Sequence, residues 1–262
     1  MIRYLRLLAT FFRMSVIADL EYRVNVIGKV VTDIFWYLTH IVLFEVMFLH
    51  VPSLGGWSIE DARVFLGMLF LADAIHMVLF AEGLDRFATL VVSGGLDLLL
   101  SKPVNSQFMV SCHRIAWSYL VNVTLAGSWL LWSLSHRLGE LSPLLFGKVV
   151  IGAGAGALIM YALRFSFASF SLIFTQADNL QYLWYTLFRL STRPHSMYPS
   201  GIKLLLVTLL PLAFIASIPA EILLGERDTI GIVSLLGVAT GCLLFSRWLW
   251  GQCLRHYTSS SS

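Results

Sequence analysis

The chain has 262 residues, of which 58% are apolar and 13% are charged, and its mean hydropathy is +0.79. Soluble domains carry about 25% charged residues, so a soluble globule of this size could not bury so much apolar surface. The composition excludes a disordered chain, a coiled coil and a disulfide scaffold, and it predicts an all-helical, polytopic membrane protein. The net charge of +3 gives no indication of nucleic acid binding.

The first segment of the chain predicts an amphipathic helix over residues 2–20, lying in the membrane interface. A frayed basic tail is the alternative. At 100° per residue the apolar and basic side chains fall on opposite faces: Leu5, Leu8, Phe12 and Val16 on one, and Arg3, Arg6 and Arg13 on the other.

Six apolar stretches follow, and a spanning helix needs about 20 such residues. The fourth is long enough that we expect it to tilt or to extend beyond the bilayer. The expected spans are 32–51, 62–81, 109–133, 145–174, 203–219 and 230–250.

The distribution of Lys and Arg predicts the orientation of these spans, because cytoplasmic loops are enriched in basic residues. With the N-terminus inside, both termini are cytoplasmic, and so are the two longest connections, 82–108 and 175–202. The inner side then holds Arg3, Arg6, Arg13, Arg23, Lys29, Arg86, Lys102, Arg114, Arg164, Arg189, Arg193, Lys203, Arg247 and Arg255, and the outer side holds Arg63, Arg137, Lys148 and Arg227.

The sequence lacks the motifs of the common soluble catalytic domains. Both long connections are under 30 residues, and no GxxxxGK[ST], GxGxxG, HExxH or GxSxG pattern occurs. The three cysteines, Cys112, Cys242 and Cys253, form no CxxC pair. We therefore expect no catalytic residues and no metal site, and no ATPase on this chain.

Ionisable residues in or near the spans are candidates for a transport pathway, because burying one in the bilayer costs at least about 2.5–3.5 kcal/mol. Asp73 and His76 share a helix face and predict either an ion or proton site or a packing contact between helices. Scattered histidines also raise haem or metal ligation as a weaker alternative. The ionisable set is Asp33, Glu45, Asp73, His76, Arg114 and Arg164, and the histidines are His40, His50, His76 and His113.

Two stretches carry more specific patterns. Residues 94–103, from Gly94 to Pro103, predict a short amphipathic segment that Pro103 ends. The second stretch is rich in proline, and its alternatives are an ordinary kinked helix and a span that kinks near Pro211 and re-enters after Pro219 as a short outer hairpin. Gly152, Gly154 and Gly156 in the fourth span predict a helix-packing face.

Together these two stretches resemble the permease subunits of ABC-2 type exporters. The nearest resemblance is to an uncharacterised bacterial branch whose permeases are often encoded in pairs beside an ATPase. Lys102 stands where the pattern has Arg, which keeps the charge but loses the bidentate geometry. The first motif falls on Gly95, Leu96, Asp97, Leu100 and Pro103, and the second on Tyr198, Pro199, Pro211, Pro219, Ala220, Leu223, Leu224 and Gly225.

The resemblance implies a dimer of permeases in the bacterial inner membrane, with ATP and Mg²⁺ bound by a separate ATPase subunit. Residues 86–107 would dock on that subunit, with Gly95, Leu96, Asp97, Leu100, Lys102 and Pro103 as coupling residues. An outer hairpin with Pro211, Pro219 and Glu221 would close the gate, and Asp73, His76 and Arg164 would line the pathway or pack between helices.

Two other functions stay open from the residues themselves. A proton- or ion-coupled carrier would use Asp73 and His76, although the second half of the chain has no counterpart of this pair. A membrane scaffold without transport would use the aromatic segment Tyr182–Phe188 to bind a partner, unless that segment is an interfacial aromatic belt.

Overall fold

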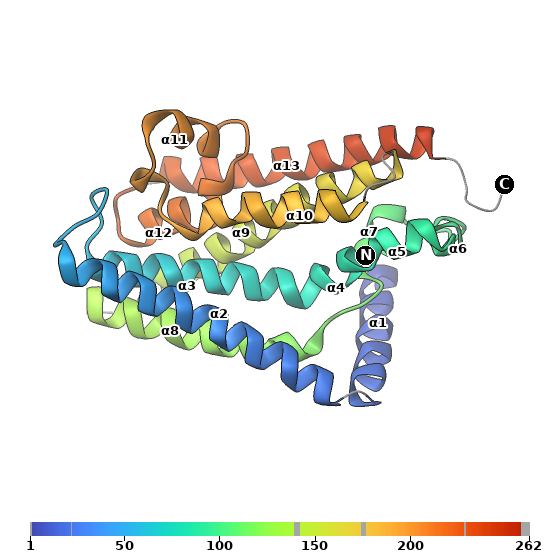
Figure 1. The fold of residues 1–262 in the computed structure, drawn as a ribbon, viewed down its shortest axis with the longest axis horizontal. Coiled ribbons are helices and arrows are strands. Elements are labelled where there is room, and N and C mark those ends of the chain that lie inside the picture. The colour runs from blue at the N-terminus through green and yellow to red at the C-terminus, as the bar shows by residue number, and fades with distance from the viewer. Residues whose placement is uncertain (1, 22, 139–141, 174–176, 228, 258–262) are drawn as a thin grey trace.

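A computed structural model describes residues 2–21, 23–138, 142–173, 177–227 and 229–257 (Figure 1). Its elements in this part of the chain are all helices, which confirms the expected all-helical class. The parts of the expected loops at 139–141 and 174–176 lie outside the described residues.

The long helices lie side by side in an elongated bundle, and α1 crosses one end of it (Figure 1). They are α1 (Ile2–Glu21), α2 (Arg23–His50), α3 (Ile59–His76), α8 (Leu120–Leu138), α9 (Pro143–Ser169), α10 (Ala177–Phe188) and α13 (Thr229–His256). Short helices connect them: α4 (Glu82–Asp85), α5 (Phe87–Val92), α6 (Gly95–Leu100), α7 (Ser106–Cys112), α11 (Ser200–Val207) and α12 (Ser217–Leu223). A π-helical turn, η1 (Met77–Ala81), continues α3, and five 3₁₀ turns are η2 (Trp117–Tyr119), η3 (Phe170–Leu172), η4 (Arg189–Thr192), η5 (His195–Met197) and η6 (Leu212–Phe214).

Four stretches of the described chain are long and apolar enough to cross a membrane. They are Val26–His50, Ile59–Val92, Pro143–Leu172 and Thr229–His256, and they correspond to the first, second, fourth and sixth expected spans. The chain is therefore a multi-pass membrane protein. The expected third span, 109–133, is divided between α7, η2 and α8.

The two ends of the bundle can be told apart by the segments that lie at them. We call the end with α5 and α6 the inner end, and the end with the loop between α2 and α3 the outer end. The start of α2 and the last turn of α13 both lie at the inner end (Figure 1).

The fifth expected span, 203–219, is not one helix. α11 ends at Val207, and a non-helical stretch leads to Pro211, whose ring removes a backbone donor and cannot continue a helix. η6 and α12 then return into the bundle, where every residue of α12 is buried. Of the two alternatives, the structure has the re-entrant hairpin, but the chain re-enters directly after Pro211 and not after Pro219.

The connection expected over residues 175–202 is not confined to one end of the bundle. α10 runs back along α9, and Trp184 packs on Phe167 with ring centroids 6.2 Å apart. Beyond α10, Ser196 Oγ accepts a hydrogen bond of 2.9 Å from Trp57 Nε1, in the loop between α2 and α3. The segment therefore runs from the inner to the outer end. Arg189, Arg193 and Lys203 do not belong with the basic residues of the inner end.

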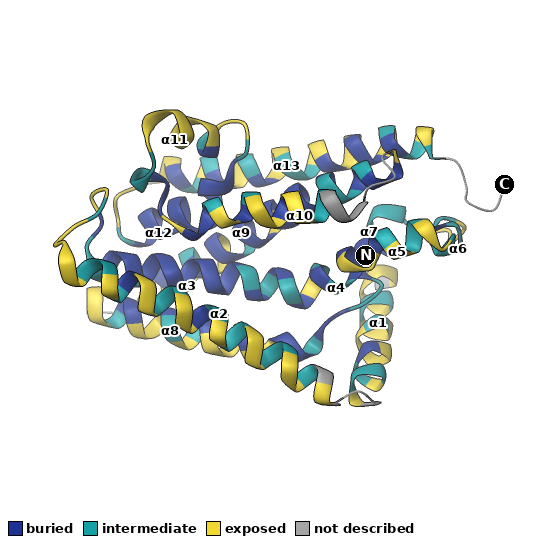
Figure 2. Ribbon diagram, viewed as in Figure 1, coloured by how far each residue is buried: buried dark blue, intermediate teal, exposed yellow. Residues whose placement is uncertain are grey.

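α3 is the central helix of the bundle (Figure 2). Ser58 begins it with a capping box in which Asp61 N donates to Ser58 Oγ at 3.2 Å and Ser58 N donates to Asp61 Oδ2 at 3.1 Å. In the most apolar 18-residue stretch of the span that contains α3, 78% of the residues are buried. The corresponding share is 11% in α2 and 22% in α13. The exposed apolar faces of α2 and α13 are left for lipid or another chain.

Glycines in α9 allow the re-entrant hairpin to approach closely. A Cβ added at Gly156 would lie 2.3 Å from the carbonyl oxygen of Ile215, and one at Gly152 would lie 3.2 Å from Pro219 Cβ. Nothing lies within 4 Å of a Cβ added at Gly154. The packing face predicted from these glycines therefore includes Gly152 and Gly156 but not Gly154.

Candidate functional site

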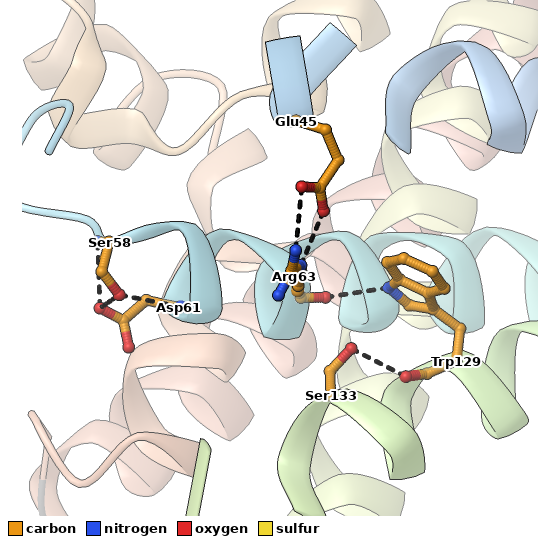
Figure 3. Close-up of polar contacts among 6 residues, drawn as sticks. All are labelled: Glu45, Ser58, Asp61, Arg63, Trp129 and Ser133. Carbon is orange, nitrogen blue, oxygen red and sulfur yellow. Dashed lines mark hydrogen bonds and ion pairs between the residues drawn. The ribbon is translucent and has the colours of Figure 1, made fainter. Parts of the chain in front are cut away.

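The outer part of α3 holds a charge that is fully paired (Figure 3). Arg63 donates two hydrogen bonds to the Glu45 carboxylate of α2, from Nε at 2.7 Å and from Nη2 at 2.9 Å. The indole of Trp129 in α8 donates to the backbone carbonyl of Arg63 at 3.1 Å. This bidentate pair ties three helices together, so Glu45 has a structural partner.

The first turn of α3 is closed in the same way. The Asp61 carboxylate accepts a hydrogen bond of 2.6 Å from Ser58 Oγ and one of 2.7 Å from Arg137 Nε at the end of α8. Glu60 adds a longer ion pair to Arg137, with an N–O distance of 3.9 Å. The outer end of the bundle is therefore held by side chains that satisfy one another.

At the inner end a single carboxylate gathers three cations. Glu82 Oε1 lies 3.5 Å from Lys29 Nζ, 3.8 Å from Arg86 Nη2 and 3.6 Å from Arg114 Nη1. These groups come from α2, from the α4–α5 junction and from the segment before η2. Arg114, expected as an intramembrane charge, is thus part of an ion-pair network that fixes α2 against the inner end of α3.

Arg164 of α9 is buried, and its charge is also compensated. Its guanidinium forms an ion pair with Asp85 and donates a hydrogen bond of 3.1 Å to the Tyr185 hydroxyl. Its Cζ lies 5.5 Å from the centre of the Tyr185 ring, and Gln181 donates to Asp85 at 2.8 Å. Arg164 therefore joins α9 and α10 to α4.

Asp73 and His76 are different. His76 is completely buried, and neither of its ring nitrogens has a hydrogen-bond partner among the described residues. Asp73 likewise has no ion pair or hydrogen bond within the described part of the chain. Asp33, another of the ionisable residues expected in the spans, does have a partner: it accepts a hydrogen bond of 2.6 Å from Asn122 of α8. Packing of polar groups against one another does not account for Asp73 and His76.

Both unpartnered residues line a cavity of about 320 Å³ between α2, α3, α9 and α10. Asp33, Arg164 and Arg189 bring further charge to its wall. Its aromatic lining consists of Trp36, Trp184, Tyr185 and Phe188. The cavity is large enough for a polar group of a substrate together with water. Asp73 and His76, which line it, belong to the span Ile59–Val92. The structure thus brings together Asp73, His76 and Arg164, which the sequence singled out.

The segment 86–107 forms two short helices, α5 and α6, before α7. Leu96 is 0% exposed, and Leu100 packs half-buried against the same apolar cluster. Leu98 and Val92 are 71% and 77% exposed. Leu96 and Leu100, expected to dock a partner, therefore hold the segment to the bundle. The exposed residues of the segment are Arg86, Thr89, Val92, Ser93, Leu98, Ser101, Lys102 and Pro103.

This segment is fixed to the last turns of α13. Trp250 Nε1 donates a hydrogen bond of 2.9 Å to Ser106 Oγ, and the rings of Trp250 and Phe87 are 5.8 Å apart. Burial raises the pKa of the Tyr257 hydroxyl, and so does the adjacent Asp97 carboxylate. Asp97 therefore faces the end of α13, while Gly95 begins α6 after Gly94, whose φ of 71° is left-handed.

α1 contacts the same segment. Arg3 Nη2 donates a hydrogen bond of 2.9 Å to the carbonyl of Pro103, and the Tyr4 and Phe108 rings are 4.9 Å apart, edge to face. Further along α1, Ser15 Oγ accepts a hydrogen bond of 3.1 Å from Ile115 N. The expected helix over 2–20 is present as Ile2–Glu21, and its contacts link it to the inner connection.

One family model, described as ABC-2 family transporter protein, matches residues 34–261. The chain belongs to the ABC-2 transporter family. No curated protein and no solved structure matches it. The family match covers both motifs and confirms the resemblance to an ABC-2 permease.

In this ABC-2 chain the outer hairpin buries an acidic residue. Glu221 of α12 is 7% exposed, forms an ion pair with Arg227, and lies 3.6 Å from His195 Nδ1. Pro219 is in the first turn of α12, where the missing proline N–H breaks no helical hydrogen bond. Glu221 therefore fixes α12 to the loop that leads into α13 and to η5.

Three of the expected histidines, His40, His50 and His113, have a ring nitrogen at hydrogen-bond distance from the backbone of their own helices. Nδ1 of His40, of His50 and of His113 each lies within 3.0 Å of a carbonyl oxygen three or four residues earlier in its own helix. Among the described residues no three His, Cys, Asp or Glu side chains are grouped for a metal ion.

Sequence reasoning missed three features of the site. Arg189 and Trp184 were assigned to a loop, so their place in the cavity wall was not expected. Leu98 lies between the motif positions Asp97 and Leu100 and belongs to no motif position itself. The periodicity of the aromatic residues in Tyr182–Phe188 was the one available hint, because Trp184 and Phe188 are buried while Tyr182 is 70% exposed.

Proposed function

We propose that this chain is the permease subunit of an ATP-driven exporter in the bacterial inner membrane. ATP and Mg²⁺ bind a separate ATPase subunit, and the permease itself catalyses no reaction. In this topology α8 and the segment that begins with α10 provide the third and fifth crossings, and both termini are cytoplasmic. The family, the multi-pass fold and the tightly held segment at the inner end support the proposal.

The observation that carries the proposal is the docking tip, defined as Val92, Leu98, Ser101, Lys102 and Pro103. These residues are exposed, yet α6 beneath them is held by the buried Leu96 and by contacts to α1 and α13. A rigid tip that is attached to several helices can pass the movement of a bound subunit to the bundle. Exposed apolar residues on such a tip are typical of an interface.

Leu98→Arg tests the docking. A charged side chain at an apolar contact should abolish co-purification with the ATPase subunit, because the guanidinium is desolvated without a partner. Leu138→Arg is the matched control, since Leu138 is an exposed leucine (38%) at the opposite end of the bundle. Retention of the ATPase and of transport in Leu98→Arg would overturn the assignment of the docking tip.

A second permease chain would cover the exposed face of α2 and the open side of the cavity. One support is that only 11% of the residues in the most apolar stretch of α2 are buried. The other is the exposed Arg189, whose charge needs water or protein around it in a bilayer. Cross-linking of Leu38→Cys on α2, which is 49% exposed, should give a covalent permease pair. Cross-linking only from the exposed face of α13, through Leu244→Cys, would place the partner elsewhere.

A proton- or ion-coupled carrier is the second candidate function, and the unpartnered Asp73 and His76 favour it. This candidate requires that the purified chain alone move substrate in liposomes under a pH gradient, and that Asp73→Asn abolish the movement. Transport that occurs only with the ATPase and ATP would exclude it.

A further inference from the structure

We propose that the cavity between α2, α3, α9 and α10 binds a protonated primary amine of the transported molecule. Asp73 is the anionic partner, and His76 is a hydrogen-bond acceptor. This inference rests on the proposed transport function only where it says that the bound amine belongs to the transported molecule. The binding itself is a property of this chain.

The balance of charge in the cavity favours a cation. Asp33 and Asp73 bring two carboxylates to the wall. Arg164 is already paired with Asp85, so Arg189 is the cation on the wall for which the described residues provide no carboxylate partner. An anionic group in the cavity would face both carboxylates, whereas an ammonium group would gain their attraction at an effective dielectric constant below that of bulk water.

The unpartnered groups specify an amine that still carries N–H donors. His76 is 0% exposed, and a buried imidazole without a counter-ion is favoured in its uncharged form, which has one acceptor nitrogen. Asp73 lies one turn before it on the same face of α3 and accepts hydrogen bonds only. A primary ammonium, with three donors, satisfies both residues at once. A quaternary ammonium satisfies neither by hydrogen bonding.

The aromatic side chains complete the site. Trp36 of α2 and Trp184 of α10 line the same cavity, and indole faces attract cations that lie within about 6 Å. The volume of about 320 Å³ holds the amine and the first part of an apolar tail. Binding of a proton alone would account for Asp73 and His76 but not for the volume of the cavity or its aromatic lining.

Three water-soluble probes test the inference on the purified full chain in detergent, without an ATPase subunit. Saturation-transfer NMR compares benzylamine, benzyltrimethylammonium and benzoate. We expect benzylamine to bind most tightly. Asp73→Asn should weaken its binding about tenfold or more, because a charge-assisted hydrogen bond contributes about 1.5–3 kcal/mol. Glu60→Gln, which removes an exposed carboxylate from the same helix, should leave binding unchanged.

A second variant separates the two parts of the site. His76→Phe keeps a ring of similar size but removes the acceptor, so benzylamine should lose its advantage over benzyltrimethylammonium. If Asp73→Asn does not yield monodisperse protein, Asp33→Asn should still weaken benzylamine binding by a smaller factor. Equal binding of benzylamine to wild type and Asp73→Asn, absence of amine binding, or tighter binding of benzoate would each overturn the inference. Amine binding by a chain that transports nothing with its ATPase would contradict only the proposed function.

Discussion

The outer and central parts of α3 carry similar side chains but treat them differently. At the outer end Asp61 and Arg63 each have a carboxylate or guanidinium partner at 2.7 Å from a neighbouring helix. About three turns further along the same helix, Asp73 and His76 have no partner among the described residues. The bilayer makes both arrangements costly unless the groups are satisfied. Paired charges are therefore explained by the fold, and unpartnered ones point to a ligand.

The packing around α3 follows the same division. Its outer part is closed by the re-entrant hairpin, which approaches α9 with Pro219 at Gly152 and with Ile215 at Gly156. Its central part borders the cavity of about 320 Å³. In the transport function proposed above, a closed outer end beside a central cavity corresponds to a pathway that is closed to the outside. The following predictions test this comparison.

The largest effect is expected from Gly156→Ala. The new methyl would lie 2.3 Å from the backbone carbonyl oxygen of Ile215, and neither helix backbone can move away without opening the outer seal. We expect a loss of about 3 kcal/mol of stability, measured by unfolding in detergent. Gly154→Ala, which has open space, should be neutral or slightly stabilising. Equal stability of the two variants would mean that the hairpin backbone at Ile215 does not pack on α9.

Glu45→Gln should have the next largest effect. The substitution keeps the shape of the side chain but removes the charge that receives two hydrogen bonds from Arg63. Because both side chains are partly exposed, with 38% and 28% exposure, we expect a loss of about 1 kcal/mol in the same unfolding measurement. A variant as stable as wild type would show that this pair does not hold the outer end.

Asp73→Asn should behave in the opposite way. No described partner loses a hydrogen bond, and the variant no longer buries a carboxylate, so its stability should equal or exceed that of the wild type. Its transport with the ATPase subunit should fall. A clear loss of stability would place Asp73 with the structural charges of the outer end and would remove the contrast between the two parts of α3.

The smallest effect is expected from Glu226→Gln, in the exposed loop between α12 and α13. Burial raises the pKa of this carboxyl, and the charges of Glu221 and Asp61 raise it further. Because the raised pKa disfavours the ionised form in the folded state, stability is lost as the pH rises through about 4.5. The variant should therefore melt slightly higher than wild type at pH 7, and the difference should vanish at pH 4. A lower melting temperature at pH 7 would contradict this electrostatic account.

The sequence predicted the class of protein and much of the chain order. Sparse charge and long apolar stretches are sufficient to predict spanning helices, since each must satisfy its own backbone within the bilayer. Four expected spans coincide with long apolar helices, and α1 occupies nearly the expected residues. The fifth span failed for a physical reason. Hydropathy indicates that a segment is removed from water but not whether lipid or protein surrounds it. In the apolar stretch 203–219 the part that enters α12 is buried by protein.

The charged residues show the same limit. The sequence identified Asp73, His76 and Arg164 as ionisable groups within spans, because any such group is conspicuous in an apolar helix. It could not tell which of them are paired, since the partners of Arg164 and Glu45 are distant in the chain. Only the tertiary structure assigned Asp85 to Arg164 and left Asp73 and His76 facing a cavity. Composition determined that this protein lies in a membrane, and packing decided which of its few charges are free to act.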